Sequence, residues 1–149
     1  MDISGCSFSE LSYSTLFNTY INNFDELRSF YKYDPLNEDH IKERAKEVSA
    51  AAYLKEYLPA LQAYHNELGI ADGQQDALQK LGQENALAVV TGQQLGMYGG
   101  PMFTIYKTMT AILLARRYEK ILERPVVPVF WLADEDHDFE EIAWTGILG

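Results

Sequence analysis

The chain has 149 residues, of which 47% are hydrophobic and 13% aromatic, and its 22 acidic and 12 basic residues give a net charge of −10. This length and apolar content fit one globular domain with a core and argue against a disordered chain. The acidic balance argues against a protein that binds the phosphate backbone of nucleic acids, although backbone dipoles can still bind a small anion.

Cysteine content and the N-terminal sequence bear on the compartment. Cys6 is the single cysteine, so no intrachain disulfide can form, which suits a reducing cytoplasm. We interpret its thiol as incidental. The chain starts without a basic segment followed by a long apolar one, and no run approaches about 18 apolar residues. We therefore expect a cytoplasmic protein without a signal peptide, a membrane span or a nucleic-acid partner.

Helix signals dominate the first half of the chain. After a serine-rich lead-in over residues 1–13, Ser14 or Thr15 can cap a short helix that runs to about residue 22. Asp25 begins a second short helix, and the dipeptide Asp34-Pro35 breaks the chain.

The strongest helix signal in this half begins at Asn37, an N-cap residue followed by two acidic residues. An amphipathic stripe follows it, and we expect this helix to end near Leu58-Pro59. Another short helix ends at Gly69. Asp72-Gly73 then turns the chain before a last helix over residues 74–81. The amphipathic stripe consists of Ile41, Ala45, Val48 and Ala52.

These signals predict an α-helical subdomain over residues 1–85 and the first, incomplete part of a second domain over residues 86–149. The helical part carries no catalytic constellation. We interpret His40 and His65, which lie on predicted helices, as surface or packing residues rather than ligands.

The second part predicts a strand, a helix and a second strand. Residues 87–91 form a short apolar run, typical of a strand covered on both faces. Gly100-Pro101 suits a helix start with proline at the first helical position. Residues 126–133 form the second strand, in which Pro128 either delays pairing until Val129 or faces away from the neighbour. Such a connection is typically parallel and right-handed, so the fold class is α/β, with an N-terminal helical segment followed by a βαβ unit.

The predicted helix is apolar on two sides, which indicates burial on more than one side. The residues of these two sides are Ile105, Met109, Ile112 and Leu113 on one and Ala111, Leu114 and Tyr118 on the other.

Two polar segments follow the two strands. Thr91 to Gln94 comes just past the first strand, and Asp134 to Asp138 just past the second. Ligands of open parallel sheets bind beyond the carboxyl ends of the strands. Although about 40 residues separate the segments along the chain, we expect them to form one site.

The first segment predicts an anion site. Its glycines permit close backbone approach, the following helix start offers free N–H groups, and Lys107 can lean back toward the same anion. The segment is neither a Walker A motif nor G-x-G-x-x-G, and an ordinary glycine turn with a solvated lysine is the alternative. The candidate cofactor-binding residues are Gly92, Gln93, Gln94, Gly100, Pro101, Met102, Phe103 and Lys107.

The second segment supplies the candidate catalytic residues, which are Glu135, Asp136, His137 and Asp138. Carboxylates crowded around an imidazole repel each other unless a cation, an amine or a hydrogen-bond donor compensates them. They can bind a substrate ammonium, coordinate Mg²⁺, or let His137 act as a general acid or base. A charged turn at the end of a strand is the structural alternative, and we interpret Glu140 and Glu141 as acids of a following helix.

These segments together resemble one family, the bacillithiol biosynthesis cysteine-adding enzymes. The resemblance extends to the earlier helices, including residues 63–66, and so covers nearly the whole chain. The segments that carry it are Val90-Thr-Gly-Gln-Gln94, Gly100-Pro101, Thr104-Ile-Tyr-Lys107, Pro128-Val-Phe-Trp131 and Glu135-Asp-His-Asp138.

The resemblance implies a ligase that adds cysteine to glucosaminyl-malate, with a Rossmann-like core shared with adenylating enzymes, ATP or a related nucleotide as cofactor, and a homodimeric full-length parent. Family members are several times longer, so we expect this chain to be an N-terminal portion that is inactive alone. Asp134 stands where the family has a small residue, and residues 143–149 depart from the family's continuation. The competing prediction is a non-catalytic module that binds a nucleotide or a small anion.

Overall fold

The structure is a computed structural model that describes residues 10–11, 13–48, 54–69, 72–96 and 99–135. The chain forms two compact units, Met1–Glu47 and Val48–Gly149. The helices that precede the sheet in the chain therefore belong partly to the first unit and partly to the second. The predicted division into residues 1–85 and 86–149 stays a prediction, and every described element before residue 85 is helical. Cys6 and nearly all of the predicted lead-in lie outside the described residues.

The first unit contains α1 (Thr15–Asn22), the 3₁₀ helix η2 (Phe24–Leu27) and α2 (Glu38–Glu47). The predicted cap of α1 is confirmed, because Ser14 Oγ accepts a hydrogen bond from the backbone N–H of Phe17 at 3.2 Å. Asn37 caps α2 in the same way, accepting from the N–H of Asp39 at 2.9 Å. Tyr20, Phe24 and Tyr31 pack their rings together between these helices.

The second unit begins with α3 (Leu54–Leu68) and α4 (Asp72–Leu81). The predicted helix from residue 37 to residue 58 is wrong, because α2 ends at Glu47 and α3 continues through Pro59. Proline removes only one intrahelical hydrogen bond, and packing can offset that loss. Leu58 supplies such packing, since its Cδ2 lies 2.7 Å from the position that a Cβ on Gly82 would occupy. The predicted turn at residues 72–73 is the first turn of α4 instead.

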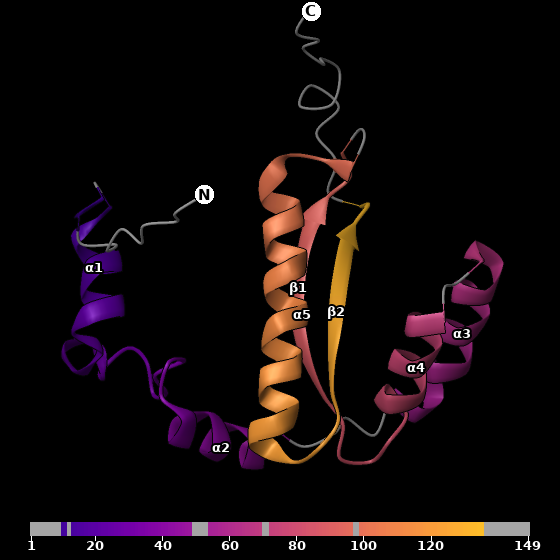
Figure 1. Cartoon of the computed structure of the whole chain (residues 1–149), viewed down its shortest axis with the longest axis horizontal. Coiled ribbons are helices and arrows are strands. Elements are labelled where there is room, and N and C mark those ends of the chain that lie inside the picture. Colours follow the sequence, from indigo (N-terminus) through magenta and orange to yellow (C-terminus); the bar gives the residue numbers. More distant parts are fainter. Residues whose placement is uncertain (1–9, 12, 49–53, 70–71, 97–98, 136–149) are drawn as a thin grey trace, which may run out of the picture. The chain divides into compact units, whose positions relative to one another are not determined.

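The sheet has two parallel strands, β1 (Leu87–Gln94) and β2 (Val126–Ala133), as predicted. The connecting helix α5 (Met102–Leu122) lies across one face and contacts both strands, while α4 contacts β2 (Figure 1). Ala111 and Ala115 are 4% and 1% exposed, and their small side chains let the helix approach the sheet closely. The strand pairing begins at Val126, so Pro128 lies inside the paired part of β2 and does not delay pairing until Val129. Proline lacks a backbone N–H, which is tolerated in an edge strand because the side away from the neighbouring strand makes no ladder hydrogen bonds.

Two burial predictions for this unit are wrong within the described residues. Val90 is 64% exposed, so β1 is not covered on both faces. The helix α5 is buried on its alanine side but open on the side of Ile105, Met109 and Leu113, which are 53%, 54% and 60% exposed. A two-stranded sheet offers one helix only one face to pack against, so the second apolar side of α5 has no layer to bury it. No described helix is long and apolar enough to cross a membrane.

Candidate functional site

The two polar segments leave the sheet at one edge. In the strand register Gln94 pairs with Ala133, the last residue of β2, and Asp134 follows directly. This confirms that the chain departs from both strands at neighbouring points. One detail is corrected, because Gly92, Gln93 and Gln94 are the last residues of β1 rather than a loop beyond it. Their positions are therefore fixed by the strand pairing itself.

Lys107 reaches this edge from the second turn of α5. Its ammonium donates a hydrogen bond to the side-chain oxygen of Gln93 at 2.9 Å, in partly buried surroundings. It also lies 5.4 Å from the ring centroid of Phe103, a cation–π distance. The side-chain N–H of Gln93 in turn donates to Gln94 Oε1 at 3.0 Å. Three residues predicted separately as ligand contacts thus form one polar chain from helix to strand.

The glycines at this edge permit close backbone contacts. A Cβ on Gly92 would lie 2.6 Å from the carbonyl oxygen of Trp131 in the neighbouring strand. A Cβ on Gly96 would lie 2.7 Å from the Cα of Gly100, so the connection between β1 and α5 folds tightly on itself. Gly99 and Gly100 have φ values of 89° and 78°, which other residues rarely adopt. Within the described residues these glycines have a demonstrable structural role.

The start of α5 carries the remaining residues of the predicted cradle. Pro101 is the N-cap rather than the first helical residue, and no side chain caps the helix there. Its carbonyl oxygen accepts from the N–H of Thr104 at 2.9 Å. Met102 and Phe103 are 65% and 50% exposed, so the first turn presents side chains to solvent. Helix N-termini leave N–H groups without intrahelical partners, which is the feature that attracts an anion.

Thr104 is a site residue that the sequence reasoning missed. Its Oγ1 is buried and has no hydrogen-bond partner in the described structure. The oxygen lies 3.2 Å from the position of a Cβ on Gly100, so a side chain at residue 100 would crowd it. Buried polar groups are normally satisfied, and an exception calls for an explanation. The signal in the sequence was its spacing, since Thr104 precedes Lys107 by three residues and shares its side of the helix.

The acidic segment is described only in part. Asp134 donates its backbone N–H to the carbonyl oxygen of Leu132 at 3.1 Å, and Glu135 is exposed just beyond the end of β2. Asp136, His137 and Asp138 lie outside the described residues, as do Glu140 and Glu141. Among the residues that are described, no group of three or more His, Cys, Asp or Glu side chains is arranged to hold a metal ion.

The two described histidines lie elsewhere. His40 accepts a hydrogen bond at Nδ1 from the backbone N–H of Asp34 at 3.0 Å and packs edge-on against the ring of Tyr33. This gives it a packing role that fits the prediction. His65 packs its ring beside that of Tyr64, 5.6 Å between centroids.

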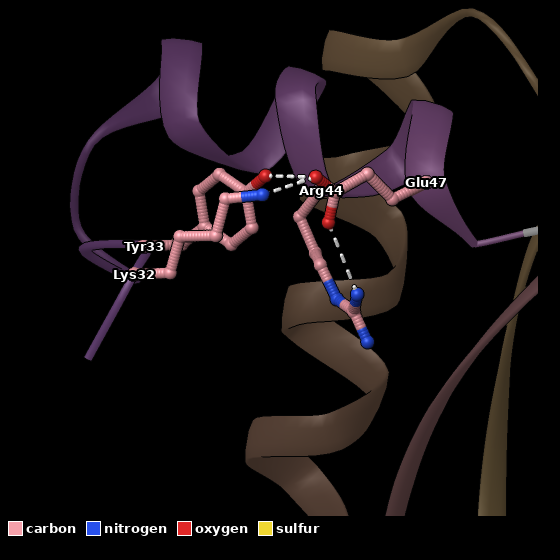
Figure 2. Close-up of polar contacts among 4 residues, drawn as sticks. All are labelled: Lys32, Tyr33, Arg44 and Glu47. Atoms are coloured by element: carbon pink, nitrogen blue, oxygen red, sulfur yellow. Dashed lines mark hydrogen bonds and ion pairs between the residues drawn. The ribbon is translucent and has the colours of Figure 1, made fainter. Parts of the chain in front are cut away.

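The largest shifts in pKa occur far from this site in the sequence, around Glu47 (Figure 2). Its carboxylate accepts from the ammonium of Lys32, from the hydroxyl of Tyr33 at 2.5 Å and from Arg44 at 3.3 Å. The hydrogen bond from Lys32, followed by that from Tyr33, lowers the pKa of Glu47 to about 2. The same bond raises the pKa of Lys32 above its usual value. This exposed cluster ties the segment after η2 to the end of α2.

Comparison with known proteins identifies one matching family and several similar proteins. The family described as "Bacillithiol biosynthesis BshC, N-terminal Rossmann-like domain" matches residues 1–149. A protein of Shouchella clausii named "Putative cysteine ligase BshC" is 38% identical over 131 residues, covering 87% of this chain and 24% of that protein. Proteins of the same name from Bacillus velezensis and Symbiobacterium thermophilum are 41% and 37% identical, covering 79% and 91% of this chain and 22% and 25% of theirs.

The chain thus spans about a quarter of the length of these curated relatives. The match covers both the helices and the βαβ unit that carries Gln93 and Lys107. The chain belongs to the bacillithiol biosynthesis BshC family and corresponds to its N-terminal Rossmann-like domain.

Proposed function

We propose that this chain supplies the anion-binding edge of a ligase that adds cysteine to glucosaminyl-malate in bacillithiol biosynthesis. The observation that carries the proposal is the ammonium of Lys107, held at the carboxyl end of β1 by the neutral side chain of Gln93 at 2.9 Å. A positive charge beside glycine backbone and a helix N-terminus suits an anion. The printed name of the relatives, cysteine ligase, supports the reaction class.

ATP or a related nucleotide fits these residues by charge and hydrogen bonding. An ammonium has three N–H donors, and Gln93 takes one of them. The other two suit phosphate oxygens. When bound, the nucleotide would supply the driving force for ligation by activating a carboxylate. Its cradle would consist of Gly92, Gln93, Gln94, Gly100, Pro101, Met102, Phe103 and Lys107.

The acidic segment Glu135–Asp138 would serve the other substrate groups. Its carboxylates suit the ammonium of cysteine or a Mg²⁺ ion, which prefers oxygen ligands. His137 would act as the general base that accepts the proton of the attacking amine when the C–N bond forms. We expect a full-length protein with this domain to act in the cytoplasm as a homodimer on the small substrates cysteine and glucosaminyl-malate.

A second function is a module that binds a nucleotide or small anion without turnover. The edge formed by Gln93, Lys107 and the start of α5 supports it, because binding alone needs no residue beyond those that form this edge.

Isothermal titration with ATP, ADP and cysteine, with and without Mg²⁺, tests both functions. We expect this chain to bind ATP and ADP, and Lys107→Met to weaken both. Binding without formation of the cysteine adduct supports the module for this chain alone. If a full-length protein containing this domain fails to bind ATP even with Mg²⁺, the ligase proposal is wrong.

A further inference from the structure

We infer that Gln93 is a positioning residue, which holds the ammonium of Lys107 in place without neutralising it, and that Lys107 makes the contact with the anion. This inference rests on the proposed function for the identity of the site. It changes the predicted role of Gln93, which the sequence alone placed among the residues that touch the cofactor.

Each end of the Gln93 amide group makes one hydrogen bond within the protein. Its oxygen accepts from Lys107 at 2.9 Å, and its nitrogen donates to Gln94 Oε1 at 3.0 Å. The reverse orientation of the amide would turn N–H donors toward the ammonium, which also only donates. The ammonium of Lys107 therefore selects the orientation in which the amide oxygen of Gln93 faces it, and this turns the nitrogen of Gln93 toward Gln94. A side chain engaged at both ends is suited to fixing a neighbour rather than to capturing a ligand.

The neutral partner of Lys107 distinguishes it from Lys80 and Lys32, which pair with carboxylates. Lys80 in the same unit pairs with the carboxylate of Glu119 at 2.7 Å, and Lys32 pairs with Glu47. A carboxylate anchor cancels the charge that it holds. An amide oxygen orients the ammonium and leaves its full charge available to an anion. Within the described residues, Lys107 makes no ion pair, and the ring of Phe103 at 5.4 Å adds a second neutral contact.

A double-mutant cycle on the full chain tests the inference, with ATP and inorganic pyrophosphate as probes in titration calorimetry. Lys107→Met removes a charged hydrogen-bond donor and should weaken binding at least about tenfold. Gln93→Leu, of similar size but without the acceptor, should weaken binding about threefold to tenfold. Gln93→Glu keeps an acceptor but neutralises Lys107, and should weaken binding at least as much as Lys107→Met.

The decisive result is the combination. If Gln93 acts through Lys107, Gln93→Leu causes no further loss in the Lys107→Met background. An additive loss means that Gln93 touches the ligand itself, and wild-type affinity in Gln93→Glu means that neutrality is unimportant; either overturns the inference. Equal affinity of Lys107→Met and wild type overturns the proposed site instead. Gln75→Leu, Gln75→Glu and Lys120→Met are matched controls at exposed helical positions, and should bind as wild type does.

A spectroscopic measurement tests the inference without any ligand. In protein labelled with ¹⁵N, the side-chain ammonium signal of Lys107 should shift and exchange faster with water in Gln93→Leu, while the signal of Lys80 stays in place. An unchanged Lys107 signal overturns the positioning role even if the chain binds no probe. A changed signal without any binding leaves the positioning role standing and overturns the anion site proposed for this chain.

Discussion

Glu47 and Lys107 each gather polar side chains from separate segments, but the two clusters balance charge differently. The carboxylate of Glu47 accepts hydrogen bonds from Lys32, Tyr33 and Arg44, so its negative charge is compensated within the first unit (Figure 2). The ammonium of Lys107 donates a hydrogen bond to an amide oxygen and lies near an aromatic ring. Both partners are neutral, so neither compensates its positive charge. The comparison teaches that the pKa shift of Glu47 accompanies a charge that is compensated within the protein, whereas the candidate site holds a charge without an opposite partner among the described residues.

The clusters also differ in how the backbone supports them. The Glu47 cluster depends on exposed side chains at the end of α2, with the Glu47 side chain itself 41% exposed. The Lys107 cluster lies where β1 and β2 end at paired residues. At this edge Gly92 and Gly96 lie so close to other backbone atoms that a Cβ would not fit. Substitutions should therefore affect the two regions through different properties, and four predictions test this.

The largest expected effect is on stability at the sheet edge. Gly92→Ala and Gly96→Ala should each lower the free energy of unfolding by about 2 kcal/mol, because the new Cβ would clash with backbone atoms at 2.6 and 2.7 Å. Urea denaturation measures this loss. Gly73→Ala, with open space around its Cβ position, is the control and should not destabilise the chain. Equal stability of all three variants would mean that the edge is not closely packed.

The second prediction concerns catalysis by a full-length protein carrying this domain. Gln94→Ala and His137→Ala should each lower the rate of cysteine addition at least about tenfold, equivalent to roughly 1.4 kcal/mol. Glu47→Gln should leave that rate unchanged, because its cluster is structural. A steady-state assay of the cysteine adduct measures all three. A rate that falls for Glu47→Gln but not for the other two would reverse the roles assigned to the clusters.

A smaller effect concerns stability at Thr104. Because its buried hydroxyl has no partner in the described structure, Thr104→Val should leave the free energy of unfolding unchanged or raise it by up to about 1 kcal/mol. Thr108→Val is the matched control, since Thr108 Oγ1 donates to the carbonyl oxygen of Thr104 at 2.8 Å. It should not gain stability. Thermal unfolding measures both variants, and a clear loss of stability in Thr104→Val would contradict the prediction.

The smallest effect is the pH dependence of the Glu47 cluster. The pKa of Glu47 falls from 4.5 to about 2 on folding, so the unfolded chain takes up the proton first as the pH drops. The contribution of Glu47 to stability is therefore present above pH 4.5 and is lost as the pH falls toward about 2. Glu47→Gln should flatten this part of the curve of unfolding midpoint against pH. Identical curves for the variant and wild type would mean that the cluster adds no stability, as is common for exposed ion pairs.

Local signals in the sequence predicted much of the fold. The caps at Ser14 and Asn37 were found correctly because a side-chain oxygen needs only the next turn of backbone to satisfy it. The parallel βαβ unit followed from two apolar runs separated by a helix of suitable length. Pro59 misled the helix assignment, because its cost is local while the packing of Leu58 on Gly82 is not visible in the sequence.

For the candidate site, the sequence by itself determined which residues stand at the ends of the two strands, since the order of elements in a βαβ unit brings those ends to one edge. Only the tertiary structure decided that β1 reaches Gln94, that the amide of Gln93 anchors Lys107, and that the hydroxyl of Thr104 is buried beside Gly100. The physical reason is that these relations depend on strand register and on the approach of α5 to the sheet. Both are set by contacts between residues far apart in the chain.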